Sequence, residues 1–193
     1  MLKSEIRIIG FDDGAFVPRS KAMVPVIGVI FRGGKFLDGA LKTDVMIDGD
    51  DGTEKIINII NSSRQKQQLK IIMFDGITLA GFNVIDAKKI YEKTNLPVII
   101  INRKMPNLKK VKKALRKFED FKAKWQAIKN AGKIKWFYIN QTRKTYYQNV
   151  GIDDETAKEV IKLSSTRSFI PEPLRAAHLI ATAFVRGESY GRA

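Results

Sequence analysis

Aspartates stand beside the ends of predicted core elements at three places in this chain. The three are Asp12, Asp51 and Asp75, and Asp13 and Asp50 are immediate neighbours of the first two. Carboxylates that met at one point would repel one another and take up protons unless a cation joined them. Mg²⁺ and Mn²⁺ take such oxygen ligands, and ions bound in this way activate water and stabilise an in-line phosphoryl displacement. We therefore expect Asp12, Asp51 and Asp75 to be catalytic and to bind one or two Mg²⁺ or Mn²⁺ ions, with Asp13 and Asp50 as fallback ligands.

Each aspartate also has a structural alternative. Asp13, Asp51 and Asp75 each precede a glycine, and Asp before Gly is common in turns and helix caps. A cap or turn role is thus the simpler interpretation of any single one. The metal-site hypothesis depends on all three lying at the ends of core elements beside a strongly basic segment.

The positive charge of the chain is concentrated in residues 103–144. The 193 residues have a net charge of +15, and this segment alone contributes +13. Cations interleaved with aromatic rings suit a nucleic-acid surface, so we expect a DNA or RNA partner. We expect Arg103 and Lys104 to hold phosphate near the metals. Lysines of a predicted basic helix would supply sequence-independent affinity; they are Lys109, Lys110, Lys113 and Lys117. The alternative is an amphipathic helix whose aromatic residues form its buried stripe and whose lysines face solvent.

Composition excludes several kinds of chemistry. The chain has no cysteine and a single histidine, His178. This excludes a disulfide scaffold, a thiolate zinc site, an iron–sulfur cluster and a cysteine nucleophile, and it argues against a Ser-His-Asp triad. We expect His178, on an apolar helix face, to have a structural hydrogen-bonding role. Without a bilayer-spanning apolar run or a signal-peptide core, we expect a soluble, cytoplasmic protein with no membrane partner.

The elements that must position these residues follow from the apolar pattern. Strands are predicted over 6–11, 23–31, 36–45, 69–74, 96–101, 134–139 and 145–150, and helices around 56–60 and over 84–93, 106–131, 153–163 and 171–184. The first three strands read as an antiparallel meander, and the later alternation of strands and helices favours parallel pairing. A fourth strand parallel to the first would bring Asp12 and Asp75 out side by side. We expect one domain over 1–193, with a frayed tail over 186–193.

Four motifs in this order resemble those of endonuclease V and of a related archaeal family of uncharacterised function, both ribonuclease-H-like. Ile9-Gly10-Phe11-Asp12 resembles a Gly-x-Asp strand end, and Asp51-Gly52 a Glu-Gly helix start. Phe74-Asp75-Gly76 resembles Val-Asp-Gly, and the stretch 171–178 closely resembles Pro-Glu-Pro-x-Arg-x-Ala-His. The resemblance covers roughly residues 5–180. It implies a ribonuclease-H-like α/β fold, a mixed sheet flanked by helices, with an acidic two-metal site formed by Asp12, Asp51 and Asp75.

The departures from endonuclease V are as informative as the matches. Asp51 stands where endonuclease V has Glu, Arg103 where it has Lys, and Ile152 where it has His. Its Pro-Tyr-Ile-Pro wedge is missing from 43–49. The sequence therefore resembles the archaeal relatives more closely, and inosine specificity is not expected.

We expect a metal-dependent, endonuclease V-like enzyme that hydrolyses phosphodiester bonds in DNA or RNA. The alternative is a non-catalytic nucleic-acid-binding protein that keeps the fold. Binding of a protein or a small anionic ligand is a third hypothesis.

Overall fold

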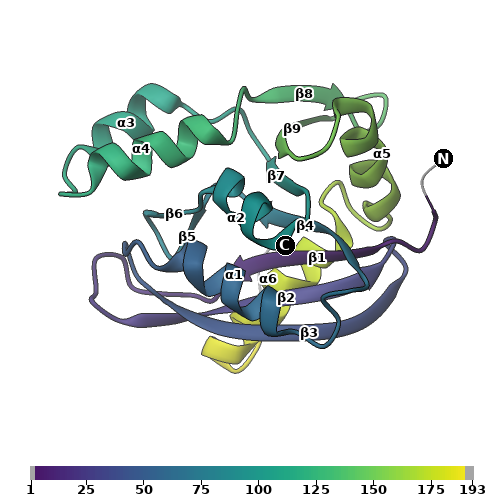
Figure 1. Ribbon diagram of the computed structural model, residues 1–193, viewed down its shortest axis with the longest axis horizontal. Coiled ribbons are helices and arrows are strands. Elements are labelled where there is room, and N and C mark those ends of the chain that lie inside the picture. The colour runs from purple at the N-terminus through teal and green to yellow at the C-terminus, as the bar shows by residue number, and fades with distance from the viewer. Residues whose placement is uncertain (1–2, 190–193) are drawn as a thin grey trace.

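A seven-stranded sheet forms the centre of the molecule, and the computed structural model describes residues 3–189 (Figure 1). The strand order is β3-β2-β1-β4-β7-β9-β8. The strands are β1 (Arg7–Asp13), β2 (Met23–Arg32), β3 (Phe36–Met46), β4 (Leu69–Asp75), β7 (Val98–Asn102), β8 (Lys135–Tyr138) and β9 (Lys144–Val150). A separate pair, β5 (Thr78–Leu79) and β6 (Asn83–Val84), was not predicted.

The direction of the strands confirms the expected ribonuclease-H-like mixed sheet. Strands β1, β2 and β3 form the antiparallel meander, and β4 pairs parallel to β1 and to β7. Beyond β7 the prediction of parallel pairing is wrong, because β9 and β8 are antiparallel hairpin partners. A short loop joins those two strands, and a short loop can connect only antiparallel neighbours.

Helices cover both faces of this sheet (Figure 1). On one face, α1 (Gly52–Ser62) and α2 (Ala87–Thr94) bury isoleucines such as Ile56 and Ile90 against Ile9 and Ile72. On the other face lie α5 (Asp154–Ser164) and α6 (Glu172–Arg186), with Leu174 against the sheet. The central strands are apolar on both sides because both faces are covered.

The close approach of α6 to β1 depends on a glycine. A Cβ atom on Gly10 would lie 2.6 Å from the carbonyl carbon of Pro173 and 2.7 Å from the nitrogen of Leu174. Any larger residue would therefore push the first turn of α6 away from the strand. The Gly10 and Pro171–Pro173 motifs, far apart in the chain, thus meet in one contact.

The predicted basic helix over 106–131 is wrong: it is two helices, α3 (Leu108–Leu115) and α4 (Phe121–Asn130). Both pack their apolar residues against β6 and its neighbour Phe82, and Phe118 in the turn contacts the Phe82 ring at a centroid distance of 5.4 Å. One straight helix of this length would span roughly 39 Å and carry its second half away from that surface. Packing therefore decides the break. The buried-stripe interpretation holds in part: Phe118 and Trp125 are partly buried and pack against this cluster, but Lys124 is buried and does not face solvent.

The end of α6 corrects the predicted tail. The helix continues to Arg186, so the first residue of the predicted frayed segment is helical, and residues 190–193 lie outside the described part. Across residues 3–189, no helix is long and apolar enough to cross a membrane.

Candidate active site

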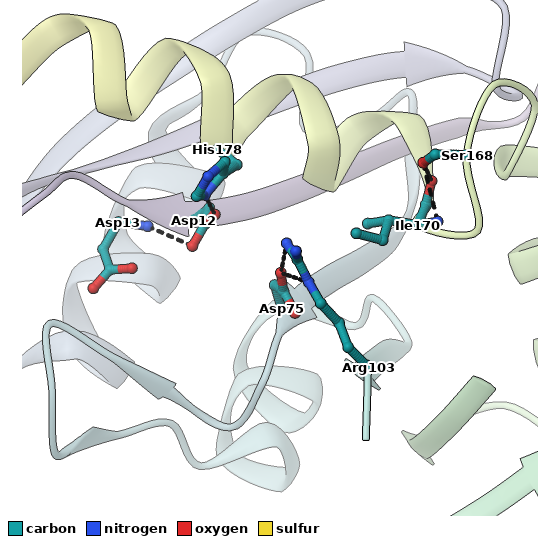
Figure 2. Close-up of polar contacts among 7 residues, drawn as sticks. All are labelled: Asp12, Asp13, Asp75, Arg103, Ser168, Ile170 and His178. Atoms are coloured by element: carbon teal, nitrogen blue, oxygen red, sulfur yellow. Dashed lines mark hydrogen bonds and ion pairs between the residues drawn. The ribbon is translucent and has the colours of Figure 1, made fainter. Parts of the chain in front are cut away.

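Two of the predicted acids end neighbouring parallel strands and point to the same face of the sheet. Alternation along β1 places Asp12 on the side of Ile8, and alternation along β4 places Asp75 on the side of Ile71 and Met73. The register pairs Phe11 with Phe74, so the two carboxylates follow in step at the carboxyl ends of β1 and β4. Both line one cavity of about 570 Å³ together with four more ionisable residues, which are Asp13, Arg103, His178 and Arg186. Figure 2 shows Asp12, Asp13, Asp75 and Arg103 beside His178 of α6.

Asp12 is held from two sides. Its side chain is nearly buried, its Oδ2 lies 2.8 Å from Nδ1 of His178, and its Oδ1 accepts a hydrogen bond from the nitrogen of Asp13 at 2.9 Å. The hydrogen bond to Asp12 raises the pKa of His178 above its ordinary value, although burial acts in the opposite direction. His178 therefore favours its protonated form beside this carboxylate.

Asp75 forms an ion pair with Arg103 across the ends of β4 and β7. The Oδ2 atom of Asp75 accepts hydrogen bonds from Nη2 of Arg103 at 2.7 Å and from Nε at 3.2 Å. Burial nonetheless raises the pKa of Asp75, with the charge of Asp12 adding to the rise and Arg103 opposing it. The ion pair with Arg103 thus offsets the effect of burial on the pKa of Asp75 only in part.

Asp13 is the third carboxylate of the cavity. Its Oδ2 accepts a hydrogen bond from the nitrogen of Ala80, just beyond β5. Burial, and after it the charge of Asp12, raises the pKa of Asp13 to about 7. Asp13, the predicted fallback ligand, therefore lines the same cavity as Asp12.

The structure does not bring Asp51 to these carboxylates. It is the N-cap residue of α1, on the opposite face of the sheet, and it is not among the residues that line the cavity. Its Oδ1 accepts hydrogen bonds from Nδ2 of Asn83 at 2.7 Å and from the nitrogen of Met46 at 3.1 Å. Its side chain thus ties the β3–α1 loop to β6. Asp50 lines a different cavity, near Glu54 and Lys124.

The expected meeting of three ligands is therefore not found. Within residues 3–189, no group of three or more His, Cys, Asp or Glu side chains is placed to hold a metal ion. An Asp-Gly pair before a helix occurs both where the aspartate binds a metal and where it only fixes a loop. Because α1 packs on the opposite face of the sheet, Asp51 has the second role here. Asp12 and Asp75 come together, and Asp51 serves a different contact.

The basic residues divide into one at the cavity and several beyond it. Arg103 continues the alternation of Ile99 and Ile101 and so reaches the same face as Asp75. Lys104 is exposed and is not among the residues lining the cavity. The four predicted lysines of the basic hairpin (α3, α4 and their connection) are also exposed; they are Lys109, Lys110, Lys113 and Lys117. In Figure 1 this hairpin extends from the end of β7, the strand edge that carries the site.

Three residues of α6 line the cavity and were not predicted to do so. They are His178, Thr182 and Arg186, which lie four residues apart and so share one face of the helix. The expected hydrogen-bonding role of His178 is present, but its partner is Asp12. The polar spacing along an otherwise apolar helix is the signal in the sequence that points to this face.

A family model described as Endonuclease dU matches residues 4–185. The chain belongs to the endonuclease dU family. A UPF0215 protein of Methanothermobacter thermautotrophicus is 49% identical, and the match covers 100% of this chain and 94% of that protein. The crystal structure of a protein of unknown function from Archaeoglobus fulgidus is similar to this endonuclease dU family chain. The two are 33% identical with a TM-score of 0.84, and the match covers 94% of this chain and 99% of that one.

The same fold occurs in endonuclease V. Human ENDOV is 15% identical with a TM-score of 0.63, over 95% of this chain and 86% of that one. An endonuclease V of Ciona intestinalis, solved in complex with a DNA containing an inosine, is 13% identical with a TM-score of 0.59, over 90% and 83% of the two chains. At these identities the comparison shows that the endonuclease dU family shares the endonuclease V fold.

Proposed function

We propose that this protein is a metal-dependent nuclease that hydrolyses phosphodiester bonds in DNA or RNA. The observation that carries the proposal is the shared cavity of Asp12 and Asp75, with Arg103 at its rim. Acids that could hold a cation and an arginine that could hold a phosphate stand side by side there. Membership of the endonuclease dU family and the endonuclease V fold support the same chemistry.

The donor set fits one hard divalent cation. Mg²⁺ is commonly held by one or two carboxylates and completes its shell with waters and substrate phosphate. Asp12 and Asp75 supply two carboxylates, and Asp13 is a third acid in the same cavity. Burial is the largest cause of the raised pKa of Asp13 and of Asp75, and the charge of Asp12 adds to it. A cation bound beside these carboxyl groups would stabilise their ionised forms.

In this proposal each residue of the chain has a defined task. Asp12 and Asp75 would hold the ion, which when bound activates water and neutralises phosphate charge. His178 keeps the Asp12 carboxylate in one orientation through the 2.8 Å contact to Oδ2. Arg103 presents a planar guanidinium that pairs with phosphate oxygens as it now pairs with Asp75.

A second candidate function is non-catalytic binding of nucleic acid. It is favoured by the partners that the two key acids already have, His178 for Asp12 and Arg103 for Asp75, and by the absence of Asp51 from the cavity. In that case the ion pairs are permanent, and nucleic-acid affinity is independent of divalent cations.

Calorimetric titration with Mg²⁺ or Mn²⁺, paired with a cleavage assay, separates the two. The substrates are single- and double-stranded DNA and RNA, including strands with deoxyuridine or inosine. We expect Asp75→Asn to lose cleavage by at least about a hundredfold and to weaken cation binding. Asp51→Asn is the matched control, because an Asn oxygen can still accept the bonds from Asn83 and Met46. Absence of metal-dependent cleavage on every substrate, or cleavage unchanged in Asp75→Asn, would refute the nuclease proposal.

A further inference from the structure

A second cavity, of about 290 Å³, adjoins the candidate active site and shares Arg103 with it. Its wall is formed by the end of β7, the start of β9 and the loop before α6. Three of its residues are cationic, Arg103, Arg143 and Lys144, and none of the residues that line it is Asp or Glu. The electrostatic preference of this cavity is therefore for an anion.

An aromatic ring adds to this preference. The ring of Phe169 lies 4.5 Å from the guanidinium carbon of Arg143, so the cavity also has a flat aromatic wall.

Two exposed aromatic rings lie on β8, the edge strand that pairs with β9. The Trp136 and Tyr138 side chains belong to residues that are 52% and 51% exposed, and their rings meet edge to face at 5.7 Å. Lys144 joins the two features: it lines the cavity, and its ammonium lies 4.0 Å from the Trp136 ring centroid. Phe137, between these two residues in sequence, is buried in the core, so Trp136 and Tyr138 take the other, exposed face of β8.

We propose that the basic cavity and the Trp136–Tyr138 pair bind a single-stranded stretch of nucleic acid that flanks the cleaved bond. A backbone phosphate would occupy the cavity between Arg103 and Arg143, and unpaired bases would stack on the exposed rings. Duplex bases are already stacked on one another and present no free faces, so this surface selects for an unpaired strand. The inference rests on the proposed function for the position of the cleaved phosphate beside Arg103, and it names the class of substrate.

Fluorescence anisotropy with labelled strands of roughly 12 nucleotides tests the proposal, because single-strand sites span about 4–16 nucleotides. Binding of single-stranded DNA, single-stranded RNA and the matching duplex is measured in EDTA, so that the result is independent of metal and cleavage. We expect a single strand to bind more tightly than the duplex. Trp136→Ala should weaken single-strand binding by about tenfold, the stacking contribution of one base. Arg143→Gln should lower the slope of log K against log salt by about 0.7.

Residues for matched control variants lie at the opposite edge of the sheet from β8. Phe36 is a half-exposed ring and Lys35 an exposed cation, both next to the turn between β2 and β3. Phe36→Ala and Lys35→Gln should leave single-strand binding within about twofold of the unmodified chain, less than the tenfold stacking effect. A duplex that binds as tightly as the single strand, no binding of any strand, or equal effects of Trp136→Ala and Phe36→Ala would overturn the inference.

The two proposals fail separately. A chain that binds single strands through Trp136 but never cleaves refutes only the nuclease function. A chain that cleaves with metal while Trp136→Ala and Arg143→Gln change neither binding nor KM refutes only the single-strand surface.

Discussion

Replacing Asp13 by Asn removes a buried negative charge with little change of shape. The hydrogen bond from the nitrogen of Ala80 can be kept, because an Asn oxygen accepts it as the carboxylate does. Burial, followed by the charge of Asp12, raises the pKa of Asp13 from 3.8 to about 7. Between these two values the folded chain holds a proton that the unfolded chain has lost.

The sign and size of the stability effect follow from this difference. Below about pH 4, Asp13 does not lower the free energy of unfolding. Its destabilising effect grows as the pH rises toward 7 and is constant above that value. One pKa unit corresponds to about 1.4 kcal/mol, so a shift of about three units lowers the free energy of unfolding by ~4 kcal/mol. The Asn variant lacks this penalty. We expect the two proteins to be equally stable near pH 4 and the variant to be more stable by ~4 kcal/mol at about pH 8.

Urea unfolding in EDTA, followed by circular dichroism across this pH range, measures the effect. Asp44→Asn is the control, since the side chain of Asp44 is 44% exposed and pairs with Lys42 at the surface. Its difference from the unmodified chain should stay small at every pH. A difference between Asp13→Asn and the unmodified chain that does not change with pH, or a variant that is less stable at about pH 8, would refute the reasoning.

Three other variants test the packing and electrostatics around the site. His178→Gln should cost most stability below about pH 6.5 and least at high pH, because the hydrogen bond to Asp12 raises the pKa of the folded histidine. Melting curves at several pH values measure this cost, and a difference in Tm between variant and unmodified chain that does not change with pH would contradict it. Gly10→Ala should lower Tm and loosen α6, at a cost of roughly 1–3 kcal/mol, because its Cβ would lie 2.6 Å from the Pro173 carbonyl carbon; an unchanged Tm would contradict this. Leu115→Ala, at a fully buried position in the basic hairpin, should cost about 2–5 kcal/mol in urea unfolding, and a loss below about 1 kcal/mol would mean the hairpin is not packed as described.

The chain's local patterns determined the strands and their acidic ends. Continuous apolar runs such as Ile71–Phe74 can be accommodated only where both faces of a strand are covered, so they identify β1, β4 and β7 as central. Parallel neighbours finish at the same edge, which brings Asp12 beside Asp75 as the pattern predicts. The concentration of positive charge in residues 103–144 is likewise a property of the sequence alone.

Only the tertiary structure decided which residues share the cavity. Asp51 precedes a helix on the other face of the sheet, and its partner Asn83 comes 32 residues later. His178 reaches Asp12 across 166 residues, through a helix contact that Gly10 permits. The basic segment bends into a hairpin because β6 offers its apolar stripe a surface. Local spacing in the sequence determines on which face of a helix or strand a residue lies. Which distant element covers that face depends on how the elements pack together in three dimensions.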